Sequence, residues 1–302
     1  MKKTNWTVRE VLAWTAQYFF QQGVEHPRLE AELLLAHVLG QTRVKLYINF
    51  DQPLQPNELA AYRELIKRRV QGYPLAYLTG QREFMSLTFE VNPAVLIPRP
   101  ETETLVETAV ELVRDAVRRY LATDGPVELP PIRIAEAGTG SGAIAVSLAR
   151  FLPAAQVWAT DISPAALAVA QRNAERHGVA DRVRFYEGDL LEPLLEPTSC
   201  GQFALVVANL PYIPTPEIPR LAREVRCEPV LALDGGADGL DLYRRLVPQA
   251  ARLLKSGGYL VMEIGFDQGK AAAALLAGED WHPPRIKPDL AGRDRVVVVQ
   301  KK

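Results

Sequence analysis

Apolar residues recur at helical spacing through the first part of the chain. Thr7 and Glu10 have the spacing of a capping box, and the apolar-periodic run that follows them continues to Gly23. Residues 26–40 and 55–72 repeat this form, each with a proline near the start and a glycine at the end. The pattern predicts an all-helical N-terminal region.

Residues 78–103 change to alternating apolar and polar positions rich in β-branched and aromatic types. The alternation is interrupted at residues 92–94, Asn-Pro-Ala, which predicts two short strands joined by a turn at that point. Helical spacing returns over residues 101–119, and the proline-rich stretch 123–131 predicts a loop.

Strands and helices alternate regularly in the rest of the chain. Continuous apolar strands separated by helices predict a mostly parallel sheet covered on both faces, that is, an α/β fold. We therefore expect a helical domain over residues 1–78, a β-hairpin linker over 79–100 and an α/β domain over 101–302. The expected strands cover residues 132–138, 156–161, 183–189, 203–209, 257–265 and 294–300, and the expected helices 142–152, 163–178 and 239–255.

Composition narrows the class of protein. The 302 residues are 48% hydrophobic and carry a formal net charge of -1, so no global field attracts nucleic acid or an anionic membrane. Cys200 and Cys227 are too few for a disulfide framework and lack metal-ligand spacing, so we expect no metal. The basic N-terminus is followed by no apolar signal region. We expect an untargeted, soluble, cytoplasmic protein without a membrane partner, and a monomer.

A glycine-rich segment follows the first strand of the α/β region. Gly138, Gly140 and Gly142 let the backbone turn sharply into a helix whose N-terminus faces a ligand. About twenty residues on, Asp161 ends the second strand, where a carboxylate accepts hydrogen bonds from a ribose diol. Together they predict an adenosine cofactor. The alternatives are a ligand-free tight turn and an Asp161 that only caps the next helix, although Ser163 is available for that cap.

The choice of cofactor depends on Glu136. This carboxylate lies two residues before the first glycine, where it would repel a dinucleotide pyrophosphate and attract the ammonium and sulfonium of S-adenosylmethionine. S-adenosylmethionine is therefore the predicted cofactor, unless Glu136 pairs with a nearby Arg or Lys. Asp189, at the end of the third strand, is positioned to accept the adenine amino group while Leu190 packs on the ring. Asp189 as a cap of the next segment is the alternative.

The fourth strand ends in polar and rigid residues. Asn209 follows an apolar run, and Leu210, Pro211 and Tyr212 come next. The Asn209 side-chain oxygen and the Leu210 carbonyl are placed to accept the two N–H groups of a planar –NH2 acceptor, which turns its lone pair toward a methyl donor. Pro211 holds the Leu210 carbonyl, and Tyr212 offers a flat face. The alternative is a plain turn with Tyr212 in the core.

Several segments in this order resemble one family. The stretches LTGQREFMSLTFEV, LIPRPETE, AGTGSGAIA, ATDIS and VVANLPYI, extended by EPVLALDGGADGL and GGYLVMEIG, resemble the PrmC/HemK family of peptide chain release factor N5-glutamine methyltransferases. The resemblance covers most of the chain. It implies a Rossmann-like class I S-adenosylmethionine-dependent methyltransferase domain with a small helical N-terminal domain joined by a β-hairpin.

The resemblance also implies a substrate and site residues. The substrate is the glutamine of the Gly-Gly-Gln motif in class 1 release factors, methylated on its side-chain amide nitrogen. Two residues depart from the family pattern: Glu136 replaces an Asp, and Leu210 replaces the first proline of the signature. The expected cofactor positions are Glu136, Gly138, Thr139, Gly140, Ser141, Gly142, Asp161, Asp189, Leu190 and Asn209, and the expected catalytic and substrate-binding element is Asn209, Leu210, Pro211 and Tyr212.

Some features stay open at this point. Arg99 and Glu101 in LIPRPETE are candidates to line the crevice, and residues 214–236 are long enough to form a lid over the glutamine. The basic residues 67–69 are either a solvated face or a contact for an acidic partner.

Two rival functions remain. A methyltransferase acting on DNA or RNA bases would use the same asparagine-proline-tyrosine element, and a cofactor-binding module without catalysis would leave Asn209 and Tyr212 unexplained.

Overall fold

A computed structural model describes residues 6–122 and 131–302 of the chain. Expectations about the basic N-terminal residues and about most of the proline-rich loop therefore lie outside the described residues. The chain divides into two compact units, one made of Met1–Gln81 with Ala222–Cys227 and the other of Arg82–Leu221 with Glu228–Lys302. Each unit has its own hydrophobic core, and they are described separately below.

The first unit is helical, and its long helices confirm the periodic pattern. Helix α1 begins with the expected capping box: Thr7 Oγ1 accepts from the Glu10 amide at 3.4 Å, and Glu10 Oε2 accepts from the Thr7 amide at 3.1 Å. Buried side chains such as Phe19 and Tyr62 form one apolar cluster. The short helices α3 and α5 were not expected. The helices are α1 (Val8–Gln21), α2 (Pro27–Leu39), α3 (Arg43–Ile48), α4 (Pro56–Val70) and α5 (Leu75–Thr79).

The basic run at the end of α4 is only partly a solvated face. The Arg69 side chain is 5% exposed and forms ion pairs with Glu30 and, at 2.7 Å, with Glu224. The Arg68 guanidinium lies 4.2 Å from the ring centroid of Tyr73. Arg69 therefore belongs to the interior of this unit, because a buried guanidinium requires carboxylate partners.

A two-stranded hairpin begins the second unit. Its strands β1 (Gln81–Phe84) and β2 (Leu87–Glu90) are joined at Met85 and Ser86, whose φ angles of 51° and 59° are both positive. Two consecutive positive φ values define the tight turn that suits a hairpin. The turn expected at Asn-Pro-Ala was therefore wrong: that tripeptide follows the second strand, and Met-Ser carries none of the usual glycine or asparagine signal.

The remaining strands form one seven-stranded sheet in the order β5-β4-β3-β6-β7-β9-β8. The first five are parallel, and β9 runs antiparallel to both of its neighbours. The chain order reverses between β3 and β6, which is where α/β sheets bind ligands. The strands are β3 (Ile132–Ala137), β4 (Ala155–Asp161), β5 (Val183–Glu187), β6 (Phe203–Ala208), β7 (Leu254–Glu263), β8 (Arg285–Pro288) and β9 (Asp294–Gln300).

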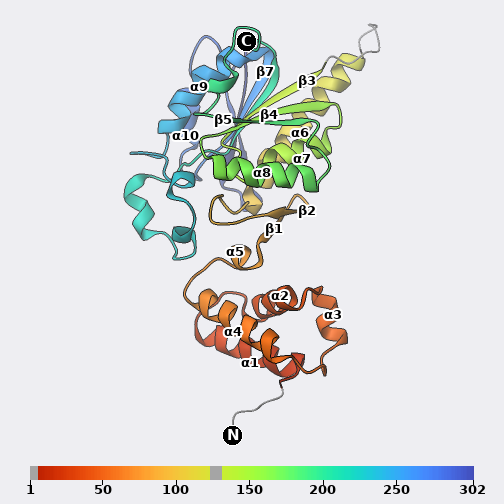
Figure 1. Cartoon of the computed structure of the whole chain (residues 1–302). Helices are drawn as coiled ribbons and strands as arrows, with labels where there is room; N and C mark the ends of the chain where they lie inside the picture. Colours follow the sequence, from red (N-terminus) through yellow and green to blue (C-terminus); the bar gives the residue numbers. More distant parts are fainter. Residues whose placement is uncertain (1–5, 123–130) are drawn as a thin grey trace. The chain divides into compact units, whose positions relative to one another are not determined.

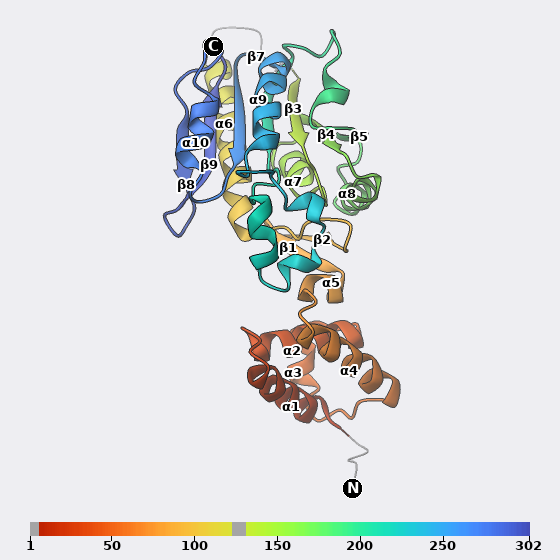
Figure 2. The same cartoon turned by 90° about the vertical axis from the view of Figure 1, so that its left-hand side faces the viewer.

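Helices cover both faces of this sheet (Figures 1 and 2). Alternate residues of the central strands point to opposite faces, so Ile134 joins one apolar cluster and Ala135 the other. The first cluster contains α6, α7 and α8, and the second contains α9 and α10. These helices are α6 (Glu103–Leu121), α7 (Ala143–Phe151), α8 (Pro164–Arg176), α9 (Asp241–Leu253) and α10 (Gly269–Leu275). The pattern predicted all of these except α10, just as it missed β8.

Candidate active site

One cavity lies at the carboxyl ends of β3, β4, β5 and β6, within the second unit. Its volume is about 480 Å³, which is in the range of small-molecule sites. Most of the predicted site residues line it, but Glu136, Gly142 and Tyr212 do not. The predicted residues in its wall are Gly138, Thr139, Gly140, Ser141, Asp161, Asp189, Leu190, Asn209, Leu210 and Pro211.

The glycine loop between β3 and α7 is shaped by backbone that only glycine adopts easily. Gly138 has φ 72°, and a Cβ at this position would lie 2.9 Å from Cδ2 of Leu210. Gly142 has φ 78°, and its Cβ would lie 3.0 Å from Cβ of Ala170 in α8. The first glycine therefore allows the loop to meet the asparagine element, and the last allows α7 to approach α8.

The carboxylate of Asp161 joins this loop to the second strand. Oδ2 accepts from the Gly140 amide at 2.8 Å and Oδ1 accepts from the Ser163 amide at 2.9 Å. Burial raises the pKa of Asp161, and these backbone hydrogen bonds oppose that effect. Ser163, not Asp161, caps α8, because its Oγ accepts from the Ala166 amide at 3.2 Å. Each Asp161 oxygen keeps a lone pair for a ligand hydroxyl.

Glu136 lies on the central strand β3, behind the loop. Its side chain is fully buried, and Oε2 accepts from the Thr139 hydroxyl at 2.7 Å while Oε1 has no hydrogen-bond partner. Burial is the main reason that its pKa rises to about 8, and the charge of Asp161 adds to the shift. Within residues 6–122 and 131–302, no Arg or Lys forms an ion pair with it. A contact between Glu136 and the cofactor ammonium stays a prediction.

Asp189 and Leu190 lie in the cavity wall after β5. Asp189 forms an ion pair with Arg245 of α9, a contact that its sequence position did not indicate. Leu190 is 7% exposed and has φ 50°, and its carbonyl accepts from the Thr160 hydroxyl at 2.5 Å. Thr160 thus holds the backbone of Leu190 in a conformation that non-glycine residues rarely adopt.

Asn209 follows β6 and faces a residue that the sequence did not single out. Its Nδ2 donates to Oγ1 of Thr102 at 3.0 Å, and Thr102 belongs to the 3-10 helix η1 (Pro100–Thr102). Both side chains are in the cavity wall. Thr102 is part of LIPRPETE, one of the stretches that carry the family resemblance. That resemblance was the one feature of the sequence that could have pointed to Thr102.

The backbone of Leu210 is held by Tyr243 of α9. The Tyr243 hydroxyl lies 3.2 Å from both the amide nitrogen and the carbonyl oxygen of Leu210, and it also contacts the carbonyl of Glu263. A tyrosine has one hydroxyl proton for two carbonyls, and a carbonyl oxygen has two lone pairs. The Leu210 carbonyl therefore remains able to accept a further N–H.

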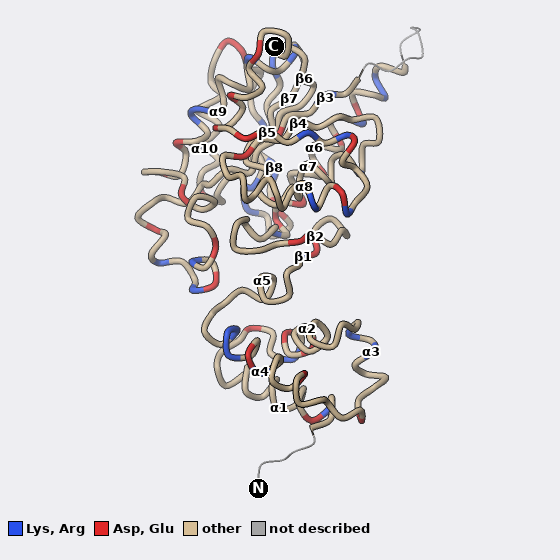
Figure 3. The backbone as a smooth tube through the Cα atoms, viewed as in Figure 1, with Lys and Arg blue, Asp and Glu red and all other residues tan. Residues whose placement is uncertain are grey.

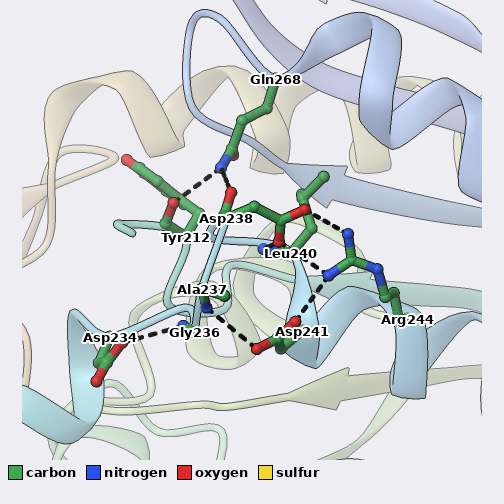
Figure 4. Close-up of polar contacts among 9 residues, drawn as sticks. All are labelled: Tyr212, Asp234, Gly236, Ala237, Asp238, Leu240, Asp241, Arg244 and Gln268. Atoms are coloured by element: carbon green, nitrogen blue, oxygen red, sulfur yellow. Dashed lines mark hydrogen bonds and ion pairs between the residues drawn. The ribbon is translucent and has the colours of Figure 1, made fainter. Parts of the chain in front are cut away.

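Tyr212 is anchored by both its side chain and its backbone. Its hydroxyl donates to Oε1 of Glu263 at 3.3 Å and accepts from Nη1 of Arg295 at 3.5 Å. Gln268 donates to the carbonyl oxygens of Tyr212 at 2.9 Å and Asp238 at 3.3 Å, which ties the asparagine element to the loop before α9 (Figure 4). Because the ring of Tyr212 is not in the cavity wall, its use as a flat support stays a prediction.

The loop before α9 is itself ordered by short-range contacts (Figure 4). Asp234 accepts from the Gly236 amide at 3.0 Å, and the Arg244 guanidinium pairs with both Asp238 and Asp241. A Cβ at Gly239 would lie 2.1 Å from the Tyr212 carbonyl oxygen. The glycine-rich sequence is therefore required for this loop to reach the backbone of Tyr212.

Arg99 lines the cavity, whereas Glu101 is not in its wall. The Arg99 guanidinium pairs with Glu228, whose side chain is 1% exposed. Oε2 of the same carboxylate accepts from the Ile97 amide at 2.9 Å. Glu228 thus fixes the LIPRPETE segment against the chain that follows Tyr212. Pro229, Leu231 and Ala232, within the expected lid, also line the cavity.

The residues of this cavity fit S-adenosylmethionine. The Asp161 carboxylate lies at the end of β4, where it is placed to accept from a ribose, the glycine loop runs into the start of α7, and Leu190 offers an apolar wall. No cluster of three or more His, Cys, Asp and Glu able to hold a metal ion occurs in the described part of the chain. The described helices likewise include none long and apolar enough to cross a membrane.

Comparisons with known proteins identify the class of domain. The sequence model of a methyltransferase domain matches residues 134–228, and that of the PrmC N-terminal domain matches residues 10–80. The catalytic domain of hMettl16, solved with the MAT2A 3'UTR hairpin 6, aligns with a TM-score of 0.52 over 78% of this chain and 82% of that chain at 13% identity. The last comparison concerns the fold alone. Fold and site together define a class I S-adenosylmethionine-dependent methyltransferase.

Curated relatives narrow the assignment from the class of methyltransferase to one family. The release factor glutamine methyltransferase of Moorella thermoacetica is 48% identical over 98% of this chain and 99% of its own length. That of Geobacter sulfurreducens is 46% identical over 97% and 96%. The chain belongs to the family of release factor glutamine methyltransferases.

Proposed function

We propose that this protein transfers a methyl group from S-adenosylmethionine to the side-chain amide nitrogen of the glutamine in the Gly-Gly-Gln motif of class 1 peptide chain release factors. The observation that carries the proposal is the position of Asn209 and Leu210 in the same cavity wall as the glycine loop. An ideal Cβ on Gly138 would lie 4.0 Å from the Asn209 carbonyl oxygen, so the two elements are neighbours.

The substrate nitrogen needs activation because the lone pair of a carboxamide is delocalised. Oδ1 of Asn209 and the carbonyl oxygen of Leu210 each accept one N–H of the glutamine amide, which directs the lone pair away from them. They also stabilise the positive charge that develops on the nitrogen. S-adenosylmethionine, when bound, supplies the sulfonium methyl group. The nitrogen gains this methyl and loses one proton, which leaves to solvent.

The two departures from the family pattern are compatible with this role. Leu210 contributes its backbone carbonyl, which any residue provides, and Tyr243 replaces part of the rigidity that a proline would give. Pro211 limits the conformation of Leu210 from the other side. Glu136 keeps a carboxyl at the usual position beside the loop.

The helical domain, residues 1–78, has a supporting role in this proposal: it helps to bind the protein substrate. A release factor acts in the cytoplasm, which is where the proposed reaction takes place. Lys and Arg are interspersed with Asp and Glu along the second unit (Figure 3), and the net charge of the chain is -1. This charge distribution favours a protein substrate over a nucleic acid, which would call for a basic face.

The test supplies methyl-labelled S-adenosylmethionine to parallel samples. They contain a class 1 release factor, its Gln-to-Ala variant at the Gly-Gly-Gln motif, DNA and RNA. We expect label on the first alone. Label on nucleic acid, or label that persists on the variant factor, would contradict the proposal, and cofactor binding without transfer to any acceptor would favour a binding module.

A further inference from the structure

The glycine loop between β3 and α7 is held by neighbours on two sides. On the side of β4, the Thr139 amide donates to the Thr160 carbonyl at 2.9 Å, and the Gly140 amide donates to Oδ2 of Asp161 at 2.8 Å. On the side of α8, the carbonyl of Ser141 accepts a hydrogen bond from a side chain of that helix. Helix α8 therefore takes part in shaping the loop.

The side chain that reaches the loop is Asn173, which is fully buried. Its Nδ2 donates to the Ser141 carbonyl at 2.8 Å and to the Glu90 carbonyl at 3.0 Å. Its Oδ1 accepts from the Glu90 amide at 2.7 Å. Because Glu90 is the last residue of β2, Asn173 connects the glycine loop with the hairpin.

The orientation of the Asn173 amide is defined by its neighbours. Two carbonyl oxygens face one end and a backbone N–H faces the other, and a carbonyl only accepts whereas an N–H only donates. Nδ2 therefore points at the two carbonyls and Oδ1 at the Glu90 amide. The two bonds to Glu90 match those that a residue of a neighbouring antiparallel strand would form, so the side chain attaches β2 as a further strand would.

An amide is unusual at this position of α8. The helix lies entirely within the described residues, and its buried side chains are Ala166, Val169, Ala170, Asn173 and Ala174. The other four are apolar and follow the spacing of a helix face that packs on a core. A buried amide is costly unless its groups are paired, so the hydrogen bonds of Asn173 are what makes an asparagine acceptable here.

Both segments that Asn173 connects contribute to the cavity. Ser141 is in the cavity wall as part of the glycine loop. The chain that follows Glu90 lines the same cavity over residues 93–96. One buried side chain therefore sets the position of the glycine loop and of the end of the hairpin, from which this second part of the wall continues.

We propose that Asn173 is a positioning residue for S-adenosylmethionine, which it serves by holding the glycine loop in the conformation that accepts the cofactor. A loop that is already ordered loses little conformational freedom when a ligand binds, so the ligand binds more tightly. Asn173 is not in the cavity wall and acts through the Ser141 carbonyl. The inference concerns the cofactor and holds whichever acceptor receives the methyl group.

The test measures the Kd of S-adenosylhomocysteine by calorimetry, so it needs no methyl acceptor. Asn173→Ala removes the hydrogen bonds to the loop, and we expect Kd to rise about tenfold, which corresponds to the loss of roughly one hydrogen bond. Asn173→Asp keeps the size of the side chain but places an oxygen against two carbonyl oxygens, so we expect a larger rise. A side chain that only filled space would give the opposite order, because alanine leaves a cavity and aspartate does not.

The matched control is the preceding residue of the same helix. Arg172 donates to both carboxylate oxygens of Glu90, at 2.7 and 3.1 Å, and forms no hydrogen bond with the glycine loop in the described structure. Arg172→Met therefore weakens the attachment of the hairpin alone, and we expect its Kd to stay within twofold of that of the unmodified protein.

Three results would overturn the proposal: an unchanged Kd in both Asn173 variants, a smaller rise in Asn173→Asp than in Asn173→Ala, or an equal rise in Arg172→Met and Asn173→Ala. The last result would show that Asn173 only attaches the hairpin. Urea unfolding at the temperature of the calorimetry establishes that each variant is folded. If Asn173→Asp does not fold, the comparison of Asn173→Ala with Arg172→Met decides.

Discussion

The Leu210 side chain occupies the space where a Cβ of Gly138 would be. Such a Cβ would lie 2.9 Å from Leu210 Cδ2, and Leu210 is 3% exposed. The residue that stands at a position usually held by proline is thus packed against the first glycine of the cofactor loop. Its side chain links the two halves of the site, in addition to the role proposed for its carbonyl.

Gly138→Ala should destabilise the protein through both backbone strain and this contact. Gly140→Ala is the matched control, since Gly140 has φ 55° but nothing within 4 Å of its Cβ, so it experiences only the strain of about 1–2 kcal/mol. In urea unfolding, we expect Gly138→Ala to lose more free energy of unfolding than Gly140→Ala. Combining it with Leu210→Ala should cost less than the sum of the single losses. Equal losses at the two glycines would show that the Leu210 contact relaxes freely.

Glu136 should make the stability of the cofactor-free protein depend on pH. Its pKa rises from 4.5 to about 8 in the folded protein, so between these values the folded state holds a proton that the unfolded state has released. The free energy of unfolding therefore falls as pH increases over this window, by up to about 1.4 kcal/mol per pH unit.

Glu136→Gln should flatten that slope and make the protein more stable than the unmodified one at pH 8, by at least about 1 kcal/mol. Urea unfolding at pH 5, 6.5 and 8 measures the effect. Glu187→Gln is a suitable control, because Glu187 is exposed and its substitution removes no buried charge. If the free energy of unfolding of Glu136→Gln changes with pH as that of the unmodified protein does across all three pH values, Glu136 is not the source of the pH dependence.

The sequence was sufficient for the features that local chemistry dictates. The glycine loop, Asp161 and Asn209 each follow an apolar strand, and parallel strands bring their carboxyl ends to one edge, so their meeting in one cavity was predictable. The long helices and the capping box at Thr7 depend on near neighbours in the chain, and they were also predicted correctly.

Features that depend on distant partners were not predictable. Thr102 and Asn209 are 107 residues apart, and no periodicity brings a 3-10 turn to the end of β6. The buried Glu263 ends an apolar strand, where a pattern of hydrophobic residues indicates packing and not a hydrogen-bonded carboxyl. The hairpin turn at Met85 and Ser86 was also missed, because neither residue type favours the positive φ angles that both adopt.

The effects of substituting Arg99 and Glu228 on the free energy of unfolding should be strongly non-additive. Arg99→Ala leaves a carboxylate whose side chain is 1% exposed with the Ile97 amide as its remaining hydrogen-bond donor. We expect a loss of about 2–3 kcal/mol in urea unfolding, near the lower end for a broken buried pair because the Arg99 side chain is 31% exposed. Adding Glu228→Gln should recover part of it by removing the uncompensated charge. Strictly additive losses would mean that water replaces Arg99 without cost.

Asn209→Ala should separate chemistry from cofactor binding. The substitution removes one of the two oxygens proposed to accept the substrate N–H groups, while the cofactor carboxylate Asp161 and the glycine loop keep their mutual contact. We expect kcat for release factor methylation to fall about 10²–10³-fold, as for the loss of one preorganised group at a developing charge. The Kd of S-adenosylmethionine, measured by calorimetry, should change by no more than a few fold. If kcat stayed within threefold of that of the unmodified enzyme, Asn209 would have no part in activating the amide, and if cofactor affinity collapsed together with kcat, its role would lie in building the cofactor site.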